Sequence, residues 1–118
     1  DMGILTISAE ESLKPEMGLH RRWTLHGVSH MLGLDVHDCS QARKDHYSES
    51  TLAVGMVLTV EPGLYIQPDD ELFAPEFRGI GIRIEDDVVV TEDGCRILSN
   101  GLPRHPDEIE KWMGSMLN

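Results

Sequence analysis

The segment from Gly79 to Glu85 alternates strictly between isoleucine and another residue, which is the period of a β-strand with one buried face. Its isoleucines are expected in the core, whereas Arg83 and Glu85 face the other way. A carboxylate inside a sheet is costly in free energy unless it is paired or binds a metal ion. The chain must therefore fold around a sheet whose polar face carries either an Arg83 to Glu85 ion pair or part of a binding site.

A second predicted strand also ends in an acid. The β-branched run at residues 56–60 leads into Glu61, and Pro62 keeps Glu61 extended while ending the strand. Glu61 is thus either a strand-end residue that reaches solvent or a second functional carboxylate. Further along, residues 88–91 and 95–98 flank a short turn that contains Gly94, a pattern that predicts a β-hairpin.

Helix signals lie near both ends of the chain. Ser8 and Glu11 form a capping box for a short helix that should end near Lys14, because a proline follows. Pro106 begins a last helix with one apolar stripe, expected to dock on the core: Ile109, Trp112, Met113 and Met116.

The other segments complete the predicted architecture. Residues 23–34 fit either a strand that runs into a helical turn or one short amphipathic helix. Residues 16–22, 39–53 and 67–77 are polar or proline-bearing and are predicted loops. With no internal repeat or linker, the prediction is a single α+β unit.

Composition limits the class of partner. The chain has 118 residues and a formal net charge of −11, which repels phosphate backbones and anionic lipid heads, so neither nucleic acid nor a membrane is an expected partner. Its apolar runs are far shorter than the ~20 residues that cross a bilayer. Cys39 and Cys95 form no CxxC pair; we expect small buried thiols and a reducing, cytoplasmic location.

Histidines gather in one segment that contains His26, His30 and His37. His26 and His30 are four positions apart, but Gly27 follows where the HExxH zinc-protease motif has glutamate, which disfavours a mononuclear zinc protease. Each histidine alone also fits a structural, hydrogen-bonded imidazole. One imidazole combined with the carboxylates of Glu61 and Glu85, with glycines alongside, fits a site for a divalent cation.

Three segments, in order, resemble the last three motif blocks of the Xaa-Pro aminopeptidases (aminopeptidase P), metallopeptidases with the pita-bread fold. They are HGVSHMLGLDVHD at 26–38, GMVLTVEPGLY at 55–65 and GIGIRIEDD at 79–87. The resemblance implies the C-terminal half of a pita-bread fold, with a curved, mostly antiparallel sheet and flanking helices. The chain opens at Asp1 in mid-pattern, so residues 1–118 are expected to be the C-terminal portion of a catalytic domain. The N-terminal half of that domain and a preceding N-terminal domain are then absent.

The resemblance also implies a metal centre with two divalent ions, manganese first, with zinc or cobalt as alternatives. His30 and Glu61 would bind one ion, and Glu85 would bridge both. The family's two remaining ligands are aspartates on earlier strands, and no block of this chain matches them. The isolated chain is therefore expected to bind metal weakly and to be inactive.

The implied activity is hydrolysis of the bond between an N-terminal residue and a following proline, by hydroxide that the two ions activate. His26 and His37 match histidines that face the substrate, Glu61 is the proton carrier, and Tyr65 and Arg83 match residues that orient the ligands. Peptides with proline at position two are the implied partners, and the full-length enzyme is an expected homo-oligomer. The alternative is a non-catalytic pita-bread module that binds peptides.

Overall fold

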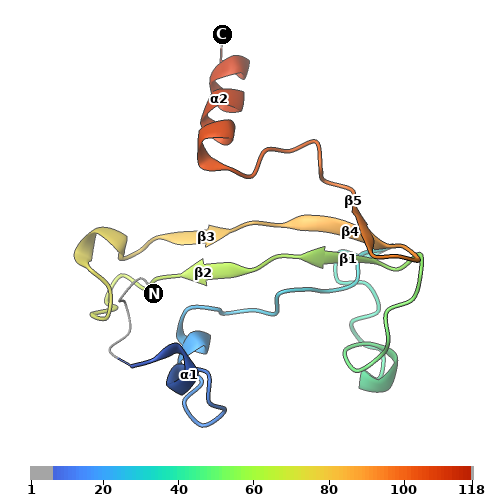
Figure 1. The fold of residues 1–118 in the computed structure, drawn as a ribbon, viewed down its shortest axis with the longest axis horizontal. Coiled ribbons are helices and arrows are strands. Elements are labelled where there is room, and N and C mark those ends of the chain that lie inside the picture. The colour runs from blue at the N-terminus through green and yellow to red at the C-terminus, as the bar shows by residue number, and fades with distance from the viewer. Residues whose placement is uncertain (1–6, 118) are drawn as a thin grey trace. The chain divides into compact units, whose positions relative to one another are not determined.

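The computed structural model describes residues 7–117 and contains, within that range, two α-helices and five β-strands (Figure 1). The chain is α+β, as the sequence predicts. In chain order the elements are α1 (Ala9–Ser12), β1 (Val57–Val60), β2 (Gly63–Tyr65), β3 (Gly81–Arg83), β4 (Asp86–Val90), β5 (Cys95–Ile97) and α2 (Pro106–Met116), with short 3-10 helices at Leu19–Arg22, Lys44–His46 and Pro75–Phe77.

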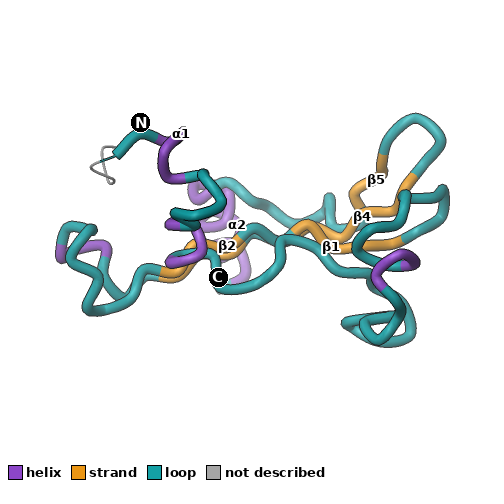
Figure 2. The backbone as a smooth tube through the Cα atoms, turned by 90° about the horizontal axis from the view of Figure 1, so that it is seen from below, coloured by secondary structure: helices purple, strands orange, loops and turns teal. Residues whose placement is uncertain are grey.

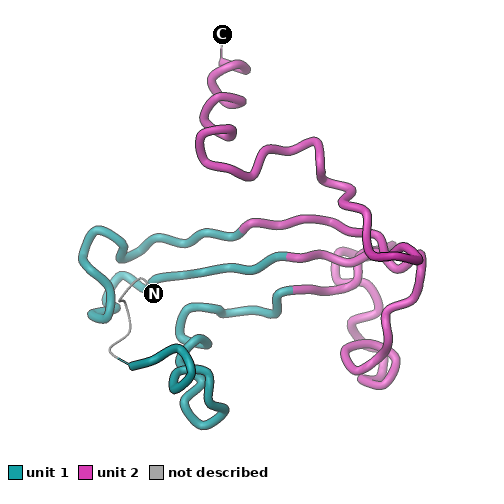
Figure 3. The backbone as a smooth tube through the Cα atoms, viewed as in Figure 1, with its two compact units in different colours: residues 1–28, 61–83 teal, residues 29–60, 84–118 magenta. Residues whose placement is uncertain are grey.

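The expectation of one structural unit is wrong. Internal contacts divide the chain into two compact units, and each is built from two separate stretches of sequence (Figure 3). One unit combines the residues up to 28 with 61–83, and the other combines 29–60 with the residues from 84 onward. Sequence composition gave no sign of this division, because neither unit is continuous along the chain.

The second unit holds an antiparallel sheet of three strands in the order β1-β4-β5 (Figure 2). Val57 pairs with Val89 and Val60 with Asp86, while Val88 of β4 pairs with Ile97 of β5. The predicted strand before Glu61 and the predicted hairpin around Gly94 are both confirmed. The interior of this sheet contains the buried Val88 and Thr59.

The first unit holds an antiparallel pair of strands, β2 and β3, in which Gly63 lies opposite Arg83. Its buried cluster comprises Trp23, Ile66 and Phe73. The Trp23 and Phe73 rings meet edge to face with centroids 5.2 Å apart, a favoured geometry for aromatic pairs. This cluster is the core of the first unit.

A buried carboxylate accepts hydrogen bonds from a residue of that core and from a neighbouring arginine. Asp70 has no exposed surface and accepts hydrogen bonds from Trp23 Nε1 at 2.7 Å and Arg22 Nε at 2.9 Å. The backbone N–H of Leu72 donates to the same carboxylate at 3.0 Å. These donors, Arg22 first and Trp23 second, lower the pKa of Asp70 from its ordinary value to about 2.

Loss of this charge is expected to destabilise the chain in a pH-dependent way. Because the folded-state pKa of Asp70 lies below its unfolded value, its stabilisation is fully present above about pH 4 and is lost as the pH falls toward about 2. Urea unfolding of the wild type and Asp70→Asn should therefore show a free-energy difference that is large at neutral pH and shrinks in acid. The exposed neighbour Asp69→Asn is the control; a pH-independent difference for Asp70→Asn would contradict the prediction.

Residues 23–34 contain no helix, so the amphipathic-helix alternative is wrong. The segment is extended, and its backbone bonds to the stretch that contains β1. Glu61 N–H donates to Val28 O at 2.8 Å, and Leu32 N–H donates to Val57 O at 3.0 Å, with an isolated bridge between Met31 and Leu58. Pairing with a distant segment satisfies these backbone groups, which local periodicity does not reveal.

The helix at each end forms as predicted, with Ser8 Oγ accepting the N–H of Glu11 at 3.1 Å and Pro106 in the first turn of α2.

Three burial predictions are wrong within the described residues. The isoleucine face of residues 79–85 is exposed: Ile82 is 58% exposed, and so are Ile80 and Ile84 to a lesser degree. The apolar stripe of α2 is exposed too, with Trp112 at 43%, together with Ile109, Met113 and Met116. No described element covers either apolar face. Cys39 and Cys95 are also exposed, and neither forms a disulfide.

Neither described helix is long and apolar enough to cross a membrane.

Candidate metal centre

Two acids stand in the short connections between strands. Glu61 and Pro62 join β1 to β2, and Ile84 and Glu85 join β3 to β4. Pro62 has no N–H and cannot continue a ladder, which fits the end of β1 at Val60. The backbone N–H of Glu61 donates to Val28 O at 2.8 Å, which holds the chain at this position.

His30 lies on the extended segment beside β1. Its Nδ1 is 3.0 Å from Met31 O. A carbonyl oxygen only accepts, so Nδ1 carries the proton and Nε2 carries the lone pair that can bind a metal. The hydrogen bond from Nδ1 to Met31 O also fixes the ring orientation, as is usual for histidines that ligate metals.

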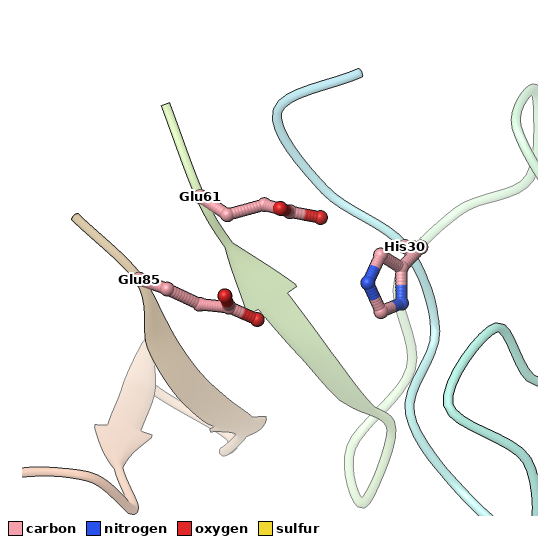
Figure 4. Close-up of side chains that lie close together, drawn as sticks. All are labelled: His30, Glu61 and Glu85. Carbon is pink, nitrogen blue, oxygen red and sulfur yellow. The ribbon is translucent and has the colours of Figure 1, made fainter. Parts of the chain in front are cut away.

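His30, Glu61 and Glu85 lie close together and can each offer one ligand atom (Figure 4). These atoms all lie within 4.8 Å of one another; Glu61 is buried, His30 half-buried and Glu85 exposed. One imidazole nitrogen and two carboxylate oxygens form a donor set that suits manganese, zinc or cobalt. The three residues predicted to bind metal are thus brought together, and their chemistry fits a divalent cation.

Two basic side chains lie near the Glu61 carboxylate. Arg83 Nε lies 3.8 Å from Glu61 Oε2, and His26 Nδ1 lies 4.0 Å from the same oxygen. Arg83 therefore forms an ion pair with Glu61. Arg83 can therefore orient the Glu61 carboxylate.

His26 is held by two short hydrogen bonds. Its Nδ1 is 2.6 Å from Gly27 O and its Nε2 is 2.6 Å from the hydroxyl of Tyr65. Since the carbonyl accepts the Nδ1 proton, neutral His26 accepts the Tyr65 O–H at Nε2. Both ring nitrogens contact the protein, so contact with a substrate requires one of these partners to give way.

His37 lies beside His30, with ring centroids 4.5 Å apart and planes at 78°. The loop between them is closed by Asp38 N–H, which donates to Met31 O at 3.1 Å. Met31 O therefore accepts two hydrogen bonds, one from His30 Nδ1 and one from the backbone N–H of Asp38, next to His37. This arrangement brings the His37 ring into edge-to-face contact with the His30 ring.

Two surface grooves reach these histidines. One runs beside His26 and is lined by residues 20, 21 and 24–28. The other reaches His30 and is lined by Ser29, Met31, Leu58 and residues of the 47–52 loop. Both grooves have mixed polar and apolar walls.

Comparison with known proteins identifies the family. Metallopeptidase family M24 matches residues 2–92, most of the chain. The chain belongs to metallopeptidase family M24. Among its M24 relatives, Xaa-Pro aminopeptidase 1 of Streptomyces coelicolor is 63% identical over 101 residues, which cover 86% of this chain and 21% of that protein. The Xaa-Pro aminopeptidase of Escherichia coli is 48% identical over 112 residues, which cover 95% of this chain and 24% of that protein.

Solved structures of the M24 family agree with the predicted fold. Aminopeptidase P from E. coli with the inhibitor Pro-Leu matches with a TM-score of 0.82 and 48% identity, over 96% of this chain and 25% of that chain. Pseudomonas aeruginosa aminopeptidase PepP matches with a TM-score of 0.82 and 42% identity, over 96% of this chain and 25% of that one. The M24 chain thus has the pita-bread fold over its matched part, and it spans about a fifth to a quarter of these relatives' length.

Two residues of this M24 chain carry structural roles that sequence reasoning missed. The sequence pattern places Asp70 in a polar loop, although its carboxylate is the buried acceptor for Trp23 Nε1. The sequence pattern indicates only that Thr59 lies in a strand, although its hydroxyl accepts the N–H of His30 at 3.1 Å. Local patterns carry no signal for either role, because both partners are distant in the sequence.

Proposed function

We propose that the chain is the C-terminal portion of the catalytic domain of an Xaa-Pro aminopeptidase. This enzyme hydrolyses the bond between an N-terminal residue and a following proline. The observation that carries the proposal is the meeting of His30, Glu61 and Glu85 within 4.8 Å, in a chain of metallopeptidase family M24. The similar Streptomyces and E. coli proteins are Xaa-Pro aminopeptidases, which supports this choice of substrate.

The proposed cofactor is a pair of divalent ions, manganese first, with zinc or cobalt as alternatives. His30 and Glu61 would hold one ion and Glu85 would bridge both, with two further carboxylates from the preceding part of the polypeptide. Bound divalent ions polarise a carbonyl and make hydroxide available near neutral pH. A three-residue donor set is too small to hold two ions, so the isolated chain is expected to be inactive.

The side chains of this chain supply the proton transfers and the orientation. Glu61 takes a proton from the attacking water at a carboxylate oxygen and delivers it to the proline nitrogen when the C–N bond breaks. Arg83, 3.8 Å from Glu61 Oε2, holds that carboxylate in position. Peptide and water then become a free amino acid and a shortened peptide with proline first.

Two histidines would stabilise the carbonyl oxygen as negative charge develops on it. His26 can donate its Nδ1 proton to this oxygen in place of Gly27 O, and Tyr65 keeps the ring oriented through Nε2. His37 approaches from beside His30. Proline nitrogen in a peptide bond has no N–H, so selection of proline must rest on the shape of the ring.

The proposal extends to location and assembly. Two exposed, unbridged cysteines favour a reducing compartment such as the cytoplasm, and the net charge of −11 disfavours nucleic acid and anionic membranes as partners. We propose a homo-oligomer for the full-length enzyme, on the resemblance to the aminopeptidase P family.

The test is a metal-dependent assay of the full-length polypeptide. With Mn²⁺, it should release the first residue from a peptide with proline second, and it should leave a matched peptide with alanine second intact. EDTA should stop the reaction and added Mn²⁺ should restore it. No proline-dependent release under any of these conditions would overturn the proposal, and tight peptide binding in EDTA without hydrolysis would indicate the non-catalytic module instead.

A further inference from the structure

We propose that Thr59 is a positioning residue for His30 and sets the metal affinity of the centre through its hydroxyl. The inference rests on the proposed function only in assigning His30 to a metal ion. In this proposal Thr59 is not itself a metal ligand; it acts through the backbone of His30.

The hydrogen bonds of His30 begin the argument. Thr59 Oγ1 accepts the backbone N–H of His30 at 3.1 Å, and Thr59 N–H donates to His30 O at 2.9 Å. Both backbone polar groups of His30 are therefore held by one residue. Thr59 is itself only 1% exposed, so water does not compete for its hydroxyl.

The strand position of Thr59 makes it a rigid anchor. Thr59 lies in β1 opposite Asp87 of β4, the middle strand of its sheet. Threonine is β-branched and has few rotamers in a strand, so its hydroxyl is fixed once the strand forms. The sheet thereby transmits its geometry to a segment with no regular secondary structure of its own.

The adjoining residue extends the constraint to the imidazole ring. Met31 N–H donates to the Tyr47 hydroxyl at 3.0 Å, and Met31 O accepts from His30 Nδ1 at 3.0 Å. A shift of the His30 backbone therefore moves both the Cα from which the ring extends and the carbonyl that orients it. Metal binding is sensitive to such shifts, because loss of a residue that orients a metal ligand typically lowers the metal affinity by about 10-fold to 100-fold.

The experiment compares variants of the full-length polypeptide by Mn²⁺ titration, with free Mn²⁺ read by its electron paramagnetic resonance signal. Thr59→Val keeps the shape but removes the acceptor, and it should weaken Mn²⁺ binding by about 10-fold to 100-fold. Thr59→Ser keeps the hydroxyl and should restore most of the affinity. Thr91→Val removes a hydroxyl that bonds only Asp93 at 3.1 Å and should bind Mn²⁺ like the wild type.

A second readout separates positioning from general destabilisation. At saturating Mn²⁺, Thr59→Val should regain its kcat, with an unchanged KM for the peptide. Wild-type affinity in Thr59→Val, or equal loss in Thr59→Val and Thr59→Ser, would overturn the inference. If Thr59→Val does not fold, Thr59→Cys replaces it, because a thiol is a weak acceptor.

His30→Ala distinguishes this inference from the proposed function. Loss of Mn²⁺ in His30→Ala with unchanged affinity in Thr59→Val overturns only the role of Thr59. Unchanged Mn²⁺ binding in His30→Ala overturns the metal centre on which the proposed function depends.

Discussion

Glu85→Ala in the full-length polypeptide should abolish peptidase activity and release more metal than Glu61→Ala. In the proposed centre Glu85 serves both ions, whereas Glu61 serves one, so only the first substitution weakens both binding sites. Substitution of a residue that only orients a metal ligand typically lowers activity by up to about 100-fold. We expect Glu85→Ala to lower it further. Metal content after dialysis, counted per polypeptide, and turnover of an Xaa-Pro peptide are the measurements.

The matched control is Glu92→Ala, which removes an exposed acid from the turn between β4 and β5. It should keep both metal content and turnover, because Glu92 is not part of the donor group formed by His30, Glu61 and Glu85. If Glu85→Ala retained two ions per polypeptide, the bridging assignment would be wrong. Equal metal loss in both site variants would make the two carboxylates equivalent.

Gly63→Ala should lower turnover about 100-fold while leaving the sheet intact. A Cβ at position 63 would lie 2.7 Å from the Tyr65 hydroxyl and 2.9 Å from His26 Nε2, closer than side chains approach one another. The added methyl group must separate Tyr65 from His26 and turn the imidazole. Misplacement of a catalytic group by ~1 Å can cost about 100-fold in rate.

Gly101→Ala is the control, since a Cβ there meets no atom within 4 Å. Its turnover should equal that of the wild type. For Gly63→Ala, we expect full metal content with reduced kcat, because neither Tyr65 nor His26 belongs to the donor group. Unchanged kcat would show that the contact between Tyr65 and His26 does not matter for the reaction.

Sequence reasoning succeeded where a signal and its effect are close together. Pro62 predicts the end of β1, Pro106 predicts the start of α2, and Ser8 predicts the cap of α1. Each residue acts on backbone groups within one turn or one peptide bond. The donor group of His30, Glu61 and Glu85 was predictable for another reason, because its residues lie in motif blocks that resemble a known family.

The failures concern contacts that local sequence patterns do not specify. Alternating isoleucines predict one apolar face but do not say what covers it, and Ile82 is exposed here. Periodicity at residues 23–34 fits a helix, yet bonds to the β1 stretch keep the segment extended. Thr59 is one more polar position in a strand until the structure sets its hydroxyl against His30.

The two tryptophans provide separate optical signals for different parts of the chain. Trp23 is 6% exposed, with its indole N–H bonded to Asp70, whereas Trp112 is 43% exposed. Iodide should therefore quench the fluorescence of Trp112 and spare that of Trp23. With Trp112→Phe, the remaining emission reports the Trp23 core alone, and its red shift during denaturation follows the loss of that core without an added label.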